Sequence, residues 1–209
     1  MTRRRRWSAA TRSVAGCCGA AALAACLDTS AGPPREQTFT VSFEDPAAGL
    51  QGWSRDTADV DDPPITWSIE RSTELASLDS SSVRLELANL NNAGKIWIER
   101  RFNVLPDTDY TVDIAFDFAS ADFGTVNLWQ IIAGASADDP EDAADLEFSG
   151  DTGNGSDTDA GHVWDERRTS VEARSSADGR LYVFLGVWGT WEATRVYYID
   201  DIRVTFMPH

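Results

Sequence analysis

Apolar side chains alternate with polar ones in segment after segment of this chain, and this period of two constrains the fold more than any other feature. The longest example runs from residue 110 to 118, where every second residue is large and apolar. Successive side chains of a β-strand point to opposite faces, so each segment predicts a half-buried strand. We expect strands over residues 38–44, 65–71, 82–89, 96–104, 110–118, 126–133, 181–188 and 196–206.

Clusters of Asp, Asn, Gly, Pro and Ser separate these segments. Pro106 followed by Asp107 is an example, because proline at the second position of a turn and aspartate after it favour a tight connection. Helical periodicity is unconvincing everywhere, apart from a turn expected near residues 140–145. The pattern predicts an all-β antiparallel sandwich, a jelly roll, forming one domain over residues 38–209. A chain of that length buries about 70% of its extended surface.

The beginning of the chain has a different composition. Five arginines precede a short, weakly apolar run that ends in Leu-Ala-Ala-Cys at Cys26. A membrane-spanning helix needs about 20 apolar residues, so this run is typical of an export signal. It resembles the signal of bacterial lipoproteins, which implies cleavage after residues 1–25, lipidation of Cys26 and a cell-envelope location facing outside the cytoplasm. The alternative is ordinary signal cleavage, with Cys26 an incidental thiol. Residues 26–37 then form a short tether.

Cysteines and charges narrow the class of protein. All three cysteines, Cys17, Cys18 and Cys26, lie in this leader, so the core of the domain must hold it without disulfides. The whole chain has a net charge of −16, and loss of the five leader arginines takes it to about −21. Nucleic acid and anionic lipid headgroups are poor partners for such a chain. We expect no nucleic-acid partner, and membrane attachment only through acyl chains.

The last expected strand contains a carboxylate among apolar residues. If the alternation is unbroken, Asp200 shares a face with Tyr198 and Ile202. A buried ionised carboxylate requires a cation or several hydrogen-bond donors. We therefore expect Asp200 either to meet a metal ion, or to cap a turn or pair with an arginine such as Arg195 or Arg203.

The two ends of the domain carry a family resemblance. The chain closes with Tyr-Ile-Asp-Asp-Ile at residues 198–202, and the domain opens with Phe43-Glu44 followed shortly by Trp53. These features resemble galactose-binding-like jelly rolls, which include many carbohydrate-binding modules. The resemblance implies neighbouring first and last strands, and a structural calcium ion between them held by acidic side chains and backbone carbonyls. The calcium ligands that it implies are Asp200, Asp201, Glu44 and Asp45.

Aromatic residues that face away from the expected core are candidates for glycan binding. A sugar-binding surface needs flat rings for the C–H faces of the sugar, and amide or charged groups for its hydroxyls. The large aromatics of these strands would equally well fill the core, and only convergence on one surface distinguishes the two. The candidates are Trp97, Arg101, Asn127, Trp129, Tyr182 and Trp188, with Trp191 at a rim.

A second acidic stretch covers residues 138–161. Its Asp and Gly residues are only superficially similar to a calcium loop, because the glutamate required at the twelfth position is His162 when counted from Asp151. We expect a solvated, flexible insertion.

Catalytic residue types are sparse. The only histidines are His162 and His209, and the domain has no cysteine nucleophile. Asp113 and Asp117 form a carboxylate pair on the outer face of one expected strand, a pattern that polar outer faces also produce. We predict a non-enzymatic lipoprotein that binds an extracellular or cell-envelope polysaccharide. The alternative is a structural or adhesive lipoprotein that contacts another protein and has no sugar site.

Overall fold

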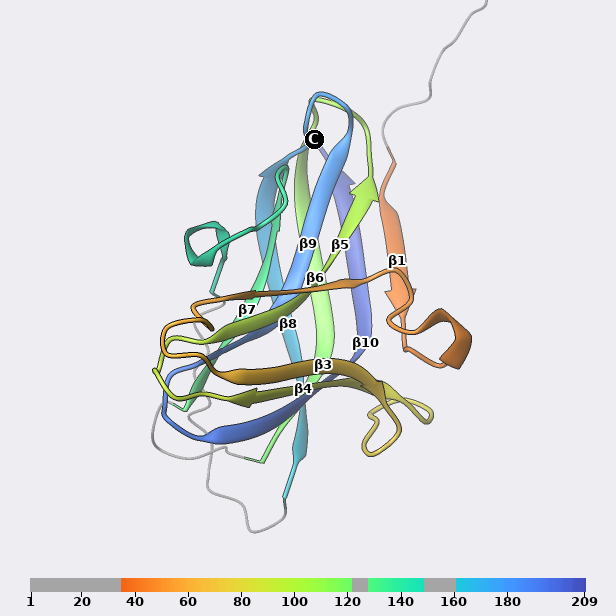
Figure 1. The fold of residues 1–209 in the computed structure, drawn as a ribbon. Helices are drawn as coiled ribbons and strands as arrows, with labels where there is room; N and C mark the ends of the chain where they lie inside the picture. The colour runs from red at the N-terminus through yellow and green to blue at the C-terminus, as the bar shows by residue number, and fades with distance from the viewer. Residues whose placement is uncertain (1–34, 122–127, 149–160) are drawn as a thin grey trace, which may run out of the picture. The chain divides into compact units, whose positions relative to one another are not determined.

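The structure is a computed structural model that describes residues 35–121, 128–148 and 161–209. These residues form ten β-strands and two short 3-10 helices, with the strands in two antiparallel sheets (Figure 1). The predicted all-β antiparallel sandwich is confirmed. The predicted signal over residues 1–25, the lipidation site Cys26 and Asn127 lie outside the described residues. Within those ranges, no helix has the length and apolar character needed to cross a membrane.

The larger sheet has six strands. Their order is β3-β4-β10-β6-β8, and β1 pairs with β10 beside that path. Val41 of β1 lies opposite Ile202 of β10, which confirms that the first and last strands are neighbours. The strands are β1 (Gln37–Val41), β3 (Thr66–Ser72), β4 (Ser82–Ala88), β6 (Asp109–Ser120), β8 (Val163–Arg174) and β10 (Thr194–Pro208).

The smaller sheet has four strands in the order β2-β5-β9-β7. From β4 onward, successive strands alternate between the two sheets, as they do in a jelly roll. The strands are β2 (Ser54–Ala58), β5 (Lys95–Asn103), β7 (Trp129–Ser136) and β9 (Arg180–Gly189). The core lies between the sheets, where the inward side chains of both form one apolar cluster.

A bulge in β10 overturns one prediction. Its register against β6 shifts between Asp200 and Arg203, and Asp201 has a positive φ of 42°. A bulge inserts an extra residue, so the side chains after it exchange faces with those before it. Ile199 before the bulge and Ile202 after it both face the core. The expectation that Asp200 shares a face with Ile202 is therefore wrong, because Asp200 lies on the outer face of the six-stranded sheet.

Two strands, β2 and β8, were not predicted. Both lie at sheet edges, and neither has the apolar alternation of the others. Most of β8 is polar on both faces, including Arg167, which points inward at the edge opposite Phe116. Charged edge strands discourage pairing with other chains. The polarity that protects this edge also removes the signal by which a strand is found in a sequence.

The outer face of the four-stranded sheet is partly enclosed by residues 137–148, which we name the cover segment. It includes the 3-10 helix η2 (Ala143–Asp145), which Asp142 caps. The Ala133 N–H donates to the Glu147 carbonyl at 3.1 Å, joining the cover to β7. Beneath it lies a second apolar cluster built on Ala58, Trp97, Ile132, Leu146 and Phe184.

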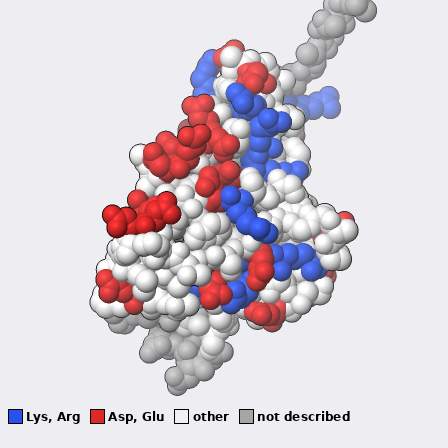
Figure 2. All heavy atoms as spheres, viewed as in Figure 1, with Lys and Arg blue, Asp and Glu red and all other residues white. Residues whose placement is uncertain are grey.

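Most of residues 138–148 are exposed, as expected of a solvated insertion, but Ala143, Leu146 and Phe148 pack against the sheet. Residues 149–160 lie outside the described ranges. Acidic side chains gather on the side of the molecule where η2 lies, next to a group of basic side chains (Figure 2). The cover segment therefore combines an apolar underside with an acidic exterior.

Candidate functional site

Trp129 lies in the core, contrary to the prediction that it faces outward. Its exposed fraction is 0%, and its ring lies 4.8 Å from that of Phe118 and 6.2 Å from that of Tyr197. β7 has apolar residues on both faces, including Ile131 toward the core and Ile132 toward the cover segment, so alternation alone did not settle its orientation. A fully enclosed indole has no surface to offer a sugar.

The predicted ligand residues of β5 and β9 do face outward, but they do not converge. Trp97 lies on the outer face of the four-stranded sheet with 0% exposure, because the cover segment encloses it. Arg101 pairs with Tyr182 across β5 and β9, while Trp188 pairs with Lys95. Six residues of β5 separate these two pairs, which corresponds to about 20 Å. The predicted residues thus belong to separate parts of the surface.

One hollow combines an exposed ring with polar side chains. It lies at the turn between β4 and β5 and the turn between β9 and β10, and its volume is about 220 Å³. Asn92, Trp191 and Glu192 line it. Trp191 is 53% exposed, whereas Trp97 and Trp129 are fully buried. Trp191 was predicted to lie at a rim, and the structure exposes its indole to solvent there.

Asn89 holds the two turns together from below. Its side-chain amide donates to the carbonyls of Gly189 at 2.7 Å and Trp191 at 3.1 Å, and its side-chain oxygen accepts from the Gly94 N–H at 3.3 Å. Only 1% of Asn89 is exposed. Its backbone N–H also donates to the Ala193 carbonyl at 3.2 Å. A buried polar side chain with these bonds fixes the backbone that carries Trp191.

Trp188 supports the same hollow from the side. Its indole N–H donates to the Asn92 carbonyl at 3.0 Å, and the Lys95 ammonium lies 4.9 Å from the centre of its ring. Lys95 in turn bonds the Asp59 carboxylate at 2.6 Å. Asn92 adopts a positive φ of 58°, a conformation that asparagine tolerates well. Trp188 therefore fixes Asn92, and its role as a ligand contact stays a prediction.

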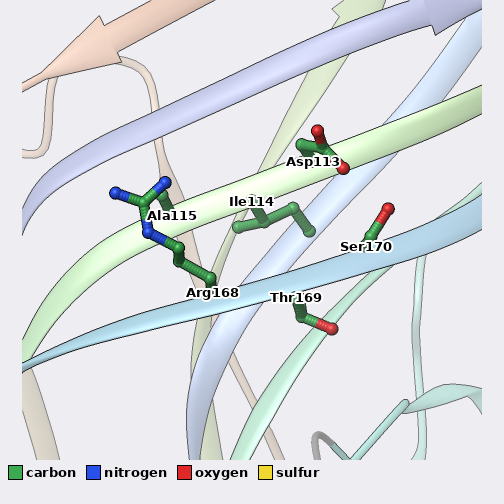
Figure 3. Close-up of a pocket in the computed structure, with 6 residues that line it drawn as sticks. All are labelled: Asp113, Ile114, Ala115, Arg168, Thr169 and Ser170. Atoms are coloured by element: carbon green, nitrogen blue, oxygen red, sulfur yellow. The ribbon is translucent and has the colours of Figure 1, made fainter.

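A second hollow, of about 290 Å³, lies between β6 and β8 in the six-stranded sheet (Figure 3). Figure 3 shows the Arg168 side chain reaching toward Ala115, with Asp113 and Ser170 farther along the strands. The hollow has polar groups but no aromatic ring among its lining residues. Asp117, the other half of the predicted carboxylate pair, accepts a hydrogen bond from the Ser77 hydroxyl. This hollow lacks the flat apolar platform that a pyranose requires.

The four predicted calcium ligands lie near the junction of β1 and β10, and hydrogen bonds engage the carboxylates of Asp200, Glu44 and Asp45. Asp200 is 0% exposed and accepts from the backbone N–H groups of Ser77 at 2.9 Å, Leu78 at 3.0 Å and Asp201 at 2.8 Å. Burial raises the pKa of Asp200, and these donors oppose that rise. Asp200 therefore caps the loop between β3 and β4, as one of the sequence alternatives states.

Glu44 caps the same loop farther along. It accepts from the Ser80 N–H at 3.2 Å, the Ser80 hydroxyl at 2.6 Å and the Ser81 N–H at 2.9 Å, and the Ser80 bond lowers the pKa of Glu44. Asp45 caps the 3-10 helix η1 (Pro46–Ala48), and Asp201 lies 3.9 Å from Arg203.

These contacts test whether the predicted ligands fit calcium. Calcium takes six to eight oxygen ligands, whereas the Asp200 and Glu44 oxygens face N–H and O–H donors of the chain itself. In the part of the chain that the structure describes, no three His, Cys, Asp or Glu side chains are grouped to hold a metal ion. The residues therefore fit the metal poorly, and calcium stays a prediction.

A buried acidic group lies under the edge of the cover segment. Glu99, on the outer face of β5, is 7% exposed and accepts from the Trp97 indole N–H at 2.8 Å. Burial, together with the nearby carboxylates of Asp139 and Asp56, raises the pKa of Glu99 to about 7, and the Trp97 bond opposes that rise. Burial and Asp139 also raise the pKa of Asp56. β2, β5 and the cover segment each supply one carboxyl group here.

Comparison with known proteins gives structural likenesses only. No family model matches the chain, and no curated protein matches it. The K3 cleaved adhesin domain of Lys-gingipain from Porphyromonas gingivalis is similar at 12% identity, covering 82% of this chain and 99% of that one, with a TM-score of 0.49. The CBM22-1 xylan-binding domain of Paenibacillus barcinonensis Xyn10C is similar at 13% identity, covering 84% of this chain and 97% of that one, with a TM-score of 0.47.

Sequence reasoning missed two residues that line the hollow and the buried residue that supports it. Asn89, Asn92 and Glu192 lie in turns, where asparagine and acidic residues are common for reasons of backbone geometry. The Asn-Leu-Asn-Asn-Ala-Gly run at residues 89–94 is a clear turn signal, but it does not show which other turn lies against it. The buried amide of Asn89 joins residues 100 positions apart, a contact that only folding creates.

Proposed function

We propose that this chain binds a carbohydrate at the hollow formed by Asn92, Trp191 and Glu192, without catalysing a reaction. The observation that carries the proposal is the half-exposed indole of Trp191 beside an amide and a carboxylate, on turns that Asn89 holds in place. A pyranose packs its C–H face on an indole, and its hydroxyls bond amide and carboxylate groups. Each of these partners is present in one hollow.

The size of the hollow favours a small ligand. Its volume of about 220 Å³ lies below the range of about 300 to 1,000 Å³ that is typical of pockets for drug-sized ligands. One sugar unit, at a chain end or a branch of a polysaccharide, is the size of ligand that we propose. Among the residues that the structure describes, Glu192 supplies the single carboxyl group that lines the hollow, whereas glycoside hydrolysis uses two. This supports binding without cleavage.

The proposed location follows from the leader. A lipid on Cys26 and a tether as far as residue 37 would hold the domain close to the envelope, because twelve residues span at most about 40 Å. A domain displayed there would meet cell-envelope or extracellular polysaccharide. We propose that this is the polymer from which the bound sugar unit comes.

A second candidate function is contact with another protein. Leu90, in the turn that adjoins Trp191, is 60% exposed, so two large apolar side chains are displayed by these neighbouring turns. Exposed apolar groups of this kind also occur in protein interfaces. The two functions differ in their dependence on Leu90. A protein partner would cover this side chain, whereas a sugar has no need to contact it.

The test measures glycan binding by the mature domain and two variants. Binding is screened on a glycan array. The affinity for each polysaccharide that gives a signal is then measured by affinity electrophoresis. Trp191→Ala removes the platform, and we expect affinity to fall by about ten- to a hundredfold, because burying a large apolar side chain contributes about 1.5 to 3 kcal/mol. Leu90→Ala is the matched control, an exposed apolar side chain removed from the adjoining turn.

The outcomes separate the two functions. Loss of glycan binding in Trp191→Ala but not in Leu90→Ala supports the sugar site. Retention of full affinity in Trp191→Ala would overturn it. If no glycan is retained by the unaltered domain, and both variants lose binding to a protein partner, the adhesive alternative is correct. Circular dichroism of each variant confirms that the sandwich is intact.

A further inference from the structure

The Arg71 guanidinium draws three oxygen atoms together at the junction of the first strand and the loop between β3 and β4. It donates from Nε to the Phe43 carbonyl at 2.6 Å, and from Nη2 to the Glu44 carbonyl at 3.3 Å and the Ser81 hydroxyl at 2.5 Å. Bonds from a charged donor to carbonyls are among the stronger hydrogen bonds in proteins. Arg71 is half-buried, which increases their contribution.

The backbone at this junction is shaped to present those oxygens. Phe43 is 0% exposed and has a positive φ of 61°, a conformation that is rare for a bulky residue. The Phe43 N–H is bonded to the Gln51 side-chain oxygen at 3.3 Å, while its carbonyl meets Arg71. The strained residue is thus held from both sides. A positively charged group is needed where two backbone carbonyls and a hydroxyl converge.

We propose that Arg71 supplies the positive charge at the place where the family resemblance implies calcium, so that this domain joins its first and last strands without a metal ion. Calcium is bound through backbone carbonyls as well as carboxylates. Here the carbonyls of Phe43 and Glu44 are bonded to the guanidinium, and the carboxylates of Glu44 and Asp200 are bonded to N–H groups of the loop. These carbonyl and carboxylate oxygens, which are the kind that calcium uses, each have a partner from the chain.

The hydrogen bonds donated by Arg71, together with those accepted by the Glu44 and Asp200 carboxylates, therefore take the place of one calcium ion. Arg71 extends from β3 to the segment after β1, and the loop that follows β3 is held by Glu44 on one side and Asp200 of β10 on the other. Glu44 follows β1 by three residues, and Asp200 belongs to β10, the strand that pairs with β1. The Arg71 charge and the loop N–H groups together stabilise a junction built from both ends of the domain.

The first experiment is a thermal melt of the unaltered domain, purified without metal, in excess EGTA and in millimolar calcium chloride. We expect the two melting temperatures to agree. A ligand that binds only the folded state at a hundredfold excess over its Kd would raise the melting temperature by about 5 °C or more in a domain of this size. A rise of that order in calcium overturns the proposal.

The second experiment removes the guanidinium. Arg71→Met keeps the length and most of the apolar stem of the side chain, and we expect its melting temperature to fall by about 5 to 10 °C in EGTA. Arg168→Met is the control, because Arg168 is an exposed arginine of the same sheet with a surface ion pair to Glu166, and such pairs contribute little. If both variants melt at nearly the same temperature, Arg71 does not stabilise the junction and the proposal is wrong.

Arg71→Lys covers the case in which Arg71→Met does not fold. Lysine retains the charge but lacks the planar fork that spans several oxygens, so we expect a melting temperature between those of Arg71→Met and the unaltered domain. A melting temperature equal to that of the unaltered domain would show that the fork is not required, and would contradict the assigned geometry. The calcium melt remains decisive in either case.

Discussion

Glu99 offers the sharpest test of the packing on the outer face of the four-stranded sheet. Its side chain is 7% exposed beneath the edge of the cover segment, and burial is the largest cause that raises its pKa from 4.5 to about 7. An acid whose pKa is higher in the folded state binds its proton more tightly there than in the unfolded chain. Stability is therefore greatest below the unfolded pKa, and is lost as the pH rises through the folded one.

The magnitude follows from the two pKa values. The difference is about 2.5 units, and each unit corresponds to about 1.4 kcal/mol, so the free energy of unfolding should fall by about 3 kcal/mol between pH 4.5 and pH 7 or above. Asp56 of β2 and Asp139 of the cover segment are the charged groups that face Glu99, and their negative charges act in the same direction. Ser54 and Trp97 face it as neutral donors.

Glu99→Gln removes the titration while keeping the shape of the side chain. The amide oxygen still accepts from the Trp97 indole, and no charge develops at any pH. We expect the variant to match the unaltered domain at about pH 5 and to exceed its free energy of unfolding by about 3 kcal/mol at about pH 8. Urea unfolding at a series of pH values measures this difference, with exposed Glu70→Gln as the control for overall charge.

The result that would refute this reasoning is simple to recognise. If the unfolding free energies of Glu99→Gln and the unaltered domain run parallel from about pH 5 to about pH 8, no proton is bound at this site on folding. The packing of the cover segment over Glu99 would then be wrong.

Two further predictions concern Asn89 and Trp129, which are both buried. Asn89→Ala removes the side-chain amide that bonds Gly189, Gly94 and Trp191. We expect the free energy of unfolding, measured in urea, to fall by about 2 to 4 kcal/mol and glycan binding to weaken. A fall below about 1 kcal/mol would contradict the role given to Asn89. Trp129→Ala empties a core position, and we expect a loss of about 3 to 5 kcal/mol, with the affinity of the folded protein for glycan unchanged. A normal stability with reduced glycan affinity would return Trp129 to the list of sugar contacts.

Much of the fold was predictable because it depends on local alternation. The predicted strand at residues 110–118 lies within β6, whose inward side chains from Tyr110 to Phe118 all belong to the core. β2 and β8 were not predictable in the same way, because an edge strand satisfies its pairing on one side only and tolerates polar residues on both faces. Turn residues such as Pro106 and Asp107 marked the connections correctly.

The candidate site was predictable only in part. Trp191 was named because it lies in the turn at residues 189–194, and Trp188 because it lies opposite the apolar face of β9. Asn127, also predicted, lies outside the described residues. Asn92 and Glu192 could not be recognised as site residues, since nothing in a single turn shows what lies beside it. The hollow exists because two turns from separate hairpins are bonded through one buried amide.

By itself, the sequence determined the class of fold, because period-two alternation and turn residues act through neighbours along the chain. The pairing of the two ends of the domain was implied only by the family resemblance. The tertiary structure alone decided which side chains reach solvent. A bulge moved Asp200 to the outer face, the cover segment enclosed Trp97, and packing between sheets took Trp129 inside. Each of these outcomes depends on contacts between residues far apart in the chain, and such contacts exist only after the sheets have met.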